Sequence, residues 1–269
     1  LGNFWEEENR YKFYDVWRDT YNLVKGTNPE AKIAGPGHCG YNYDFIKEFL
    51  SYCKKNDCLP EVVVWHELSD QSIYWMESNF EGYYSICEDL GIQRLPVCIS
   101  EYGLMRTNGI PGESVKWIQR IEKQDAYGCV AYWRLANNLN DTAADDNSPN
   151  SNWWLYRKYA EMKGQQRLLV ESKSMNEYEP QNRLDGLATL TNDGKTINMI
   201  VTGKDKKSYI SLKNLDTTDI NGDVDIRVET VYYEGLSGIV SEPIVLRQYT
   251  AKANKNLNIG LPGTDDDAV

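Results

Sequence analysis

The most constraining feature of this sequence is a regular alternation of amphipathic segments and short apolar runs over residues 1–164. Apolar residues repeat with helical spacing in several segments, which predicts helices at 7–25, 43–55, 78–90, 113–123 and 153–162. The apolar runs between them predict strands at 32–36, 61–66, 95–101 and 128–133. Strands that are apolar on both faces are typical of a parallel sheet covered by helices, either an open doubly wound sheet or a barrel.

The pattern changes after residue 164, where a period of two replaces the helical period. Val224, Ile226 and Val228 alternate with charged residues, and the same alternation recurs at 257–261. Asn-Asp-Gly at 192–194 is a turn signal of the kind that joins antiparallel strands. We therefore predict two domains, an α/β domain at 1–164 and a β-sandwich at 165–269.

Composition limits the classes of ligand. The formal net charge of −11 at pH 7 repels phosphate backbones and anionic lipid headgroups, so we expect neither nucleic acid nor a membrane as partner. A neutral sugar meets no such repulsion, and Tyr and Trp side chains offer apolar faces with polar edges that match sugars. No Gly-x-Gly-x-x-Gly motif follows a predicted strand, which disfavours a dinucleotide cofactor. We expect no cofactor.

The six cysteines all lie in the first half of the chain. Their spacing matches neither a zinc knuckle nor a Cys-x-x-Cys redox motif, so we interpret them as reduced, structural thiols. This usage fits a cytoplasmic or a secreted protein alike.

Polar residues gather where the predicted strands end, and Glu101 is the foremost of them. It follows an apolar strand and precedes Tyr102-Gly103, where the chain must turn. A carboxylate at the end of a buried strand is costly to desolvate, and a retaining glycosidase needs such a fixed carboxylate as nucleophile. The alternative is a structural Glu that caps a helix or pairs with Arg106.

The two histidines of the sequence, His38 and His66, also fall at predicted strand ends. Each is either a group of the active site or a hydrogen-bonded imidazole of the fold. A metal site that combines them with Glu67 or Glu101 lacks the short His-x-His or His-Glu-x-x-His spacing. We therefore expect no metal.

Four motifs, taken in chain order, carry a family resemblance. They are Asn-Pro-Glu-Ala-Lys-Ile-Ala-Gly-Pro at 28–36, Val-Val-Val-Trp-His-Glu-Leu at 62–68, Ile-Ser-Glu-Tyr-Gly at 99–103 and Val-Ala-Tyr-Trp at 130–133. In this order they resemble the last strands of clan A glycoside hydrolases, and most of all glycoside hydrolase family 39. The resemblance implies the C-terminal half of a (β/α)₈ TIM barrel at 1–164, followed by an all-β sandwich domain that resembles the accessory domain of that family.

The resemblance also implies roles for the residues at the strand ends. Glu101 would be the nucleophile on the seventh strand, in a double displacement of a β-xyloside-like substrate. His66 would hydrogen-bond the nucleophile or the sugar, and Trp133 would form the aromatic floor beneath the sugar. We expect the substrate-binding residues at this rim to be His66, Trp133, Tyr102, Glu67 and His38. For Glu67 the alternative is a structural ion pair with an Arg.

The acid/base residue of the clan is a Glu in an Asn-Glu-Pro motif, and this sequence contains no Asn-Glu-Pro. The opening residues 1–5 resemble the loop that follows that motif, so we expect the acid/base Glu upstream of Leu1 and an inactive isolated fragment. Glu6, Glu7 and Glu8 are interpreted as the acidic start of the first helix.

Two other interpretations stay open beside a hydrolase that takes an oligosaccharide or glycoside. The missing acid/base residue favours a carbohydrate-binding protein without catalysis. The unpaired edges of half a barrel favour self-association or assembly with a complementing N-terminal half-barrel.

Overall fold

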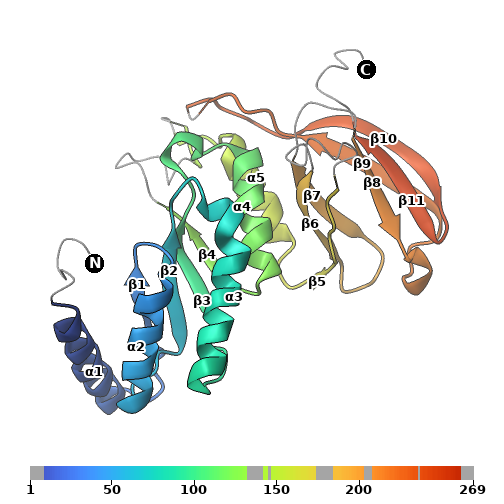
Figure 1. Ribbon diagram of the computed structural model, residues 1–269. Coiled ribbons are helices and arrows are strands. Elements are labelled where there is room, and N and C mark those ends of the chain that lie inside the picture. The colour runs from blue at the N-terminus through green and yellow to red at the C-terminus, as the bar shows by residue number, and fades with distance from the viewer. Residues whose placement is uncertain are drawn as a thin grey trace. The chain divides into compact units, whose positions relative to one another are not determined.

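The computed structural model describes residues 9–131, 142–144, 147–173, 184–202, 208–235 and 237–261 (Figure 1). The chain forms two compact units. The parallel unit comprises Leu1–Arg106 and Arg120–Trp133, and the antiparallel unit comprises Thr107–Gln119 and Arg134–Val269.

The parallel unit is built on a sheet with the strand order β1-β2-β3-β4, in which every neighbouring pair is parallel. The sequence order and the spatial order of the strands agree. The neighbouring strands are parallel because the chain crosses back to the same end of the sheet before each next strand. The elements are α1 (Arg10–Thr27), β1 (Ala34–His38), α2 (Tyr43–Lys55), β2 (Val62–Glu67), α3 (Ser72–Leu90), β3 (Val97–Tyr102) and β4 (Tyr127–Val130).

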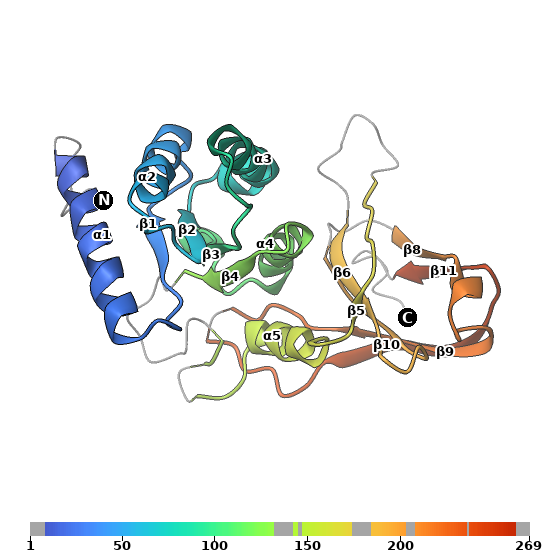
Figure 2. The same ribbon diagram turned by 90° about the horizontal axis from the view of Figure 1, so that it is seen from below.

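Helices α1, α2 and α3 lie along the same side of this sheet (Figure 2). Trp17 of α1 lies so close to β1 that a Cβ on Gly35 would clash with its ring. On α3, the Phe80 ring lies 5.2 Å from that of Trp65 in β2. The Asn42 side chain accepts a 2.9 Å hydrogen bond from the Phe45 N–H and caps α2, which presents a buried apolar face. The core of the unit is therefore aromatic and lies between helices and sheet.

The antiparallel unit contains three small sheets. β5 (Gln166–Arg167), β6 (Asp185–Leu190) and β7 (Ile197–Thr202) form one, β8 (Ser208–Lys213) pairs with β11 (Asn256–Leu261), and β9 (Gly222–Thr230) pairs with β10 (Ile244–Ala253). Two short 3₁₀ turns, η2 (Met105–Thr107) and η3 (Leu215–Thr217), complete the described elements together with helices α4 (Pro111–Lys123) and α5 (Ser151–Glu161).

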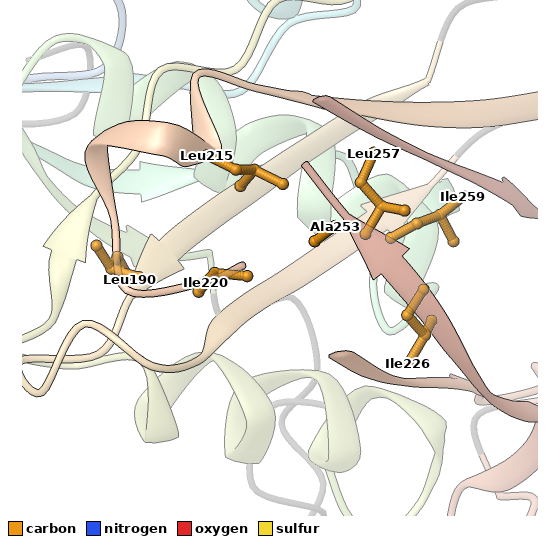
Figure 3. Packing of buried hydrophobic residues seen from close by; sticks show 7 residues of the cluster. All are labelled: Leu190, Leu215, Ile220, Ile226, Ala253, Leu257 and Ile259. Atoms are coloured by element: carbon orange, nitrogen blue, oxygen red, sulfur yellow. The ribbon is translucent and has the colours of Figure 1, made fainter. Parts of the chain in front are cut away.

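One apolar cluster joins the three antiparallel sheets (Figure 3). The side chains come from β6, η3, β9, β10 and β11 and from the segment between η3 and β9, and they are Leu190, Leu215, Ile220, Ile226, Ala253, Leu257 and Ile259. Because strand residues alternate between the two faces, the predicted alternation at 224–228 and 257–261 places one apolar face of each strand on this cluster. The sheets therefore share a single core.

Helix α5 is hydrogen-bonded to the segment that connects β9 and β10. Trp154 Nε1 donates to the Val240 carbonyl at 2.6 Å, and Ser151 Oγ donates to the Tyr232 carbonyl at 2.5 Å. Ser114 on the first half of α4 donates to Asn152 at 3.2 Å. The first half of α4 and all of α5 precede residue 165, where the sequence predicts the domain boundary, yet they belong to the antiparallel unit. The end of α4, from Arg120 to Lys123, belongs to the parallel unit.

The structure confirms an α/β chain with a parallel sheet. The six cysteines are free thiols. Among the described residues, no helix is both long enough and apolar enough to cross a membrane.

Candidate active site

The carboxyl ends of the parallel strands are irregular, and the irregularities lie side by side. The pairing register shifts between Pro36 and His38 in β1, between Trp65 and His66 in β2, and between Ile99 and Tyr102 in β3. Such shifts are common beside active sites, because they change the direction in which a side chain points. Gly37, with φ of +73°, and Gly103, with φ of +101°, adopt left-handed conformations that favour glycine at these strand ends.

His66 and Glu101 face each other across β2 and β3. They are register partners, and His66 Nδ1 lies 3.4 Å from Glu101 Oε2. The Glu101 side chain keeps 46% of its surface exposed and that of His66 keeps 21%. A protonated Nδ1 can donate to one carboxylate oxygen while the exposed part of the carboxylate stays accessible to a ligand. This carboxylate can therefore act as an oriented nucleophile or base.

Arg106, the alternative partner that the sequence offers for Glu101, pairs instead with Asp70. Both of those side chains are largely exposed, so the pair joins two surface loops.

His38 lies at the end of β1, half-buried against α2. Its Nδ1 lies 2.6 Å from the Gly40 carbonyl and donates to it, and its ring centroid lies 4.6 Å from that of Phe45. Burial lowers the pKa of His38 because it disfavours the imidazolium. The Nδ1 atom of His38 is thus engaged within its own loop.

Glu67 is buried, with 2% of its surface exposed. Its Oε1 accepts hydrogen bonds from Trp65 Nε1 and from Asn79 Nδ2 of α3, both at 2.8 Å. Burial raises the pKa of the Glu67 carboxyl, against the hydrogen bonds from Asn79, Trp65 and Ser72. The carboxyl group therefore points toward α3.

Tyr102 is also buried, with 4% of its surface exposed. A Cβ on Gly128 of β4 would come within 3.2 Å of its ring, so Tyr102 packs closely against that strand. Trp133 lies outside the described residues. Of the expected site residues, the structure thus brings Glu101 and His66 into contact, and substrate contact by His38, Glu67, Tyr102 and Trp133 stays a prediction.

Sequence reasoning missed Asn79 and Trp65, which hold Glu67. Trp65 and Glu67 share one face of a strand because they are two residues apart, and that spacing was a usable signal. Nothing in the sequence singles out Asn79. In the part of the chain that the structure describes, no three His, Cys, Asp or Glu side chains are grouped so that they could hold a metal ion.

These features define a parallel α/β protein with an oriented carboxylate at the carboxyl edge of its sheet, as in many barrel enzymes. No protein-family model matches the chain. It is 31% identical over 261 residues to a 3-O-β-L-arabinopyranosyl-α-L-arabinofuranosidase of Bifidobacterium pseudocatenulatum, a match that covers 90% of this chain and 26% of that protein. It is also 31% identical over 246 residues to a 3-O-α-D-galactosyl-α-L-arabinofuranosidase of Bifidobacterium longum subsp. longum, covering 88% of this chain and 21% of that one. The chain thus spans about a quarter of the length of these curated relatives.

Two solved structures are similar to this chain. The protein N2152 of Neocallimastix frontalis superposes with a TM-score of 0.84 at 26% identity, covering 97% of this chain and 64% of that one. A GH39 β-xylosidase of Caulobacter crescentus superposes at 0.55 with 13% identity, covering 97% and 61%, and this likeness is one of fold alone. The predicted resemblance to clan A glycoside hydrolases is thus confirmed, in sequence by the two arabinofuranosidases and in fold by the GH39 β-xylosidase.

Proposed function

We propose that this chain is the nucleophile-bearing part of a retaining glycoside hydrolase that acts on α-L-arabinofuranosides. The observation that carries the proposal is the contact between His66 Nδ1 and Glu101 Oε2, 3.4 Å apart at the carboxyl ends of adjacent parallel strands. The substrate class follows the names of the two relatives at 31% identity. A β-xyloside is the second candidate, because an 88-residue stretch is 27% identical to a β-xylosidase of Geobacillus stearothermophilus.

The proposed architecture is the C-terminal half of a (β/α)₈ barrel followed by a β-sandwich. Parallel strands in sequential order with helices along one side support the half-barrel, and three antiparallel sheets around one core support the sandwich. We keep the domain boundary near residue 164 in this proposal.

The proposed reaction is a double displacement. The Glu101 carboxylate attacks the anomeric carbon and forms a glycosyl-enzyme, while a second carboxylic acid protonates the departing oxygen. The same group then removes a proton from water, which attacks the anomeric carbon and releases Glu101 and the sugar. His66 orients one oxygen of Glu101, so the other oxygen is directed at the sugar. The second carboxyl group would lie about 5–5.5 Å away.

We propose that the second carboxyl group comes from a segment outside these 269 residues. The absence of Asn-Glu-Pro from the sequence supports this, as does the share of the relatives that the chain spans. The 269-residue chain alone is then expected to show no turnover. It is also expected to self-associate or to bind a complementing half-barrel through β1 and β4, the edge strands of the described parallel sheet. A stable monomer in sedimentation would contradict that expectation.

The test is turnover of 4-nitrophenyl α-L-arabinofuranoside by a longer protein that carries this sequence. Glu101→Gln is expected to lower kcat by about 10³-fold or more, because the amide cannot form the glycosyl-enzyme. Glu77→Gln is the matched control, since Glu77 is an exposed carboxylate of the same unit paired with Lys123, and it should keep full activity. Proton NMR should show the first-formed sugar with retained anomeric configuration.

Two outcomes would overturn the assignment. If Glu101→Gln turns over at the wild-type rate, the nucleophile lies elsewhere. If the wild-type protein hydrolyses neither the arabinofuranoside nor the matching β-xyloside but binds oligosaccharides, it is a carbohydrate-binding protein.

A further inference from the structure

Glu67 is a buried carboxylate that the proposed double displacement does not use. It is the last residue of β2 and directly follows His66. Taking a carboxylate out of water is unfavourable unless hydrogen bonds replace the lost hydration. With 2% of its surface exposed, Glu67 therefore depends on the groups that surround it.

Those groups tie the end of β2 to α3. Trp65 Nε1 and Asn79 Nδ2 both donate to the same oxygen, Oε1, at 2.8 Å. Trp65 belongs to β2 and Asn79 to α3, so one carboxylate oxygen joins strand and helix. Ser72, at the start of α3, forms a 3.0 Å contact with Ser69 Oγ in the connecting loop.

The backbone of Glu67 reaches the other strand of the site. Its carbonyl accepts a 3.2 Å hydrogen bond from the Gly103 N–H, just after Glu101 and Tyr102. Glu67 is also the register partner of Tyr102, next to the pairing of His66 with Glu101. A displacement of Glu67 would therefore move His66 directly and Glu101 through Gly103 and Tyr102.

We propose that Glu67 is a positioning residue, which fixes the ends of β2 and β3 against α3 so that His66 and Glu101 stay aligned. The proposal rests on the function proposed above for Glu101. Direct binding of a sugar by Glu67 agrees less well with the structure, because the carboxylate is buried and accepts its bonds from Trp65 and α3.

The experiment compares Glu67→Met, Glu67→Gln and Tyr83→Phe in the longer protein, with kcat, KM and Tm measured for each. Glu67→Met leaves two buried donors unpaired and is expected to lower kcat by about 10–100-fold, with KM changed less than about threefold. Glu67→Gln should keep kcat within about threefold, because its Oε1 can accept the same two bonds. Tyr83, which also belongs to α3, donates a 3.0 Å hydrogen bond from its buried hydroxyl to the Leu95 carbonyl. Tyr83→Phe removes this bond and should lower Tm without changing kcat.

If Glu67 has a purely structural role, the opposite result is expected. Glu67→Met would then lower Tm as Tyr83→Phe does and leave kcat unchanged, which would overturn the proposal. If Glu67→Met does not fold, Asn79→Ala replaces it, with an expected loss of about 3–10-fold in kcat, and an unchanged kcat in that folded variant overturns the proposal equally. Glu101→Gln, assayed in parallel, separates the two claims: its full activity refutes the proposed function, whereas its inactivity beside a fully active Glu67→Met refutes the positioning role alone.

Discussion

The parallel and antiparallel units differ in where their strand pairing is irregular. In the parallel unit each neighbouring pair changes register near the carboxyl ends, at the level of His38, His66 and Glu101. In the antiparallel unit the described ladders of β6 with β7 and of β8 with β11 run without a shift, and β9 with β10 shifts between Val245 and Arg247. Regular ladders thus support the shared core of the antiparallel unit, whereas the irregular strand ends of the parallel unit bring polar side chains together.

The cores of the two units differ as well. The parallel unit buries Phe49, Trp65 and Phe80 completely, each at 0% exposure. The antiparallel cluster is aliphatic and slightly more open, with Ile226 at 8% and Leu257 at 9%. Because aromatic side chains bury more surface, the parallel unit should depend more strongly on single core residues.

Core truncation gives the largest expected change in stability. Phe80→Ala should lower the free energy of unfolding by about 3–5 kcal/mol, since it leaves a cavity beside Trp65. Ile226→Ala should cost about 2–3 kcal/mol, because its site is smaller and partly open to solvent. Urea unfolding followed by circular dichroism measures both. If Ile226→Ala lowers the free energy of unfolding by as much as Phe80→Ala or by more, the parallel unit does not depend more strongly on single core residues.

Removal of the imidazole partner of Glu101 has the next largest effect. His66→Ala should lower kcat/KM by about 10–100-fold, or about 1.4–2.7 kcal/mol, because Glu101 loses the group that orients it. Arg227→Ala in the antiparallel unit removes an exposed pair with Glu229 and should leave kcat/KM within about twofold. Equal losses in the two variants would show that the strand ends of the parallel sheet carry no special function.

Two carboxyl groups, one in each unit, should show opposite pH dependence of stability. Burial raises the pKa of Glu67 in the folded state, so the folded protein binds its proton more tightly and loses stability as pH rises above the ordinary value of 4.5. Hydrogen bonds from Thr191 and the Lys195 N–H lower the pKa of Asp193, which stabilises the fold above the ordinary value of 3.8 and ceases to do so as pH falls below it.

Unfolding curves between pH 3 and pH 7 would test these signs. Relative to the wild-type protein, Glu67→Gln should become more stable as pH rises, and Asp193→Asn should become less stable. The second effect is expected to be the smaller one, because Asp193 is exposed in a turn. A pH-independent difference for Glu67→Gln would contradict the burial effect assigned to its carboxyl.

Periodicity located most elements of the parallel unit. The predicted helix at 43–55 matches α2, and the predicted strand at 95–101 matches β3 within two residues at each end. Helix α3 begins at Ser72, whereas the sequence predicted its start at residue 78. The first turns were missed because Tyr74 and Trp75 are apolar but exposed, so they interrupt the helical spacing of buried residues. In α1 the apolar residue Val16 is 48% exposed, whereas Tyr14 is buried at 2%.

The site was predictable only in part, for a reason that lies in strand geometry. The position of Glu101 and His66 at strand ends follows from the apolar runs that precede them. Their alignment depends on register shifts, which are set by pairing between strands distant in sequence. Since neighbouring strand residues face opposite sides, His66 contacts Glu101 while Glu67 turns to α3, a difference that composition alone does not reveal.

Covalent labelling tests the central claim most directly. An epoxide analogue of arabinofuranose, which a glycosidase nucleophile opens to form a stable ester, would be incubated with the longer protein before trypsin digestion and mass spectrometry. The account predicts the label on the peptide at residues 95–106, whose one carboxylate is Glu101. Inactivation with that carboxylate unmodified and the label on another residue would contradict the account.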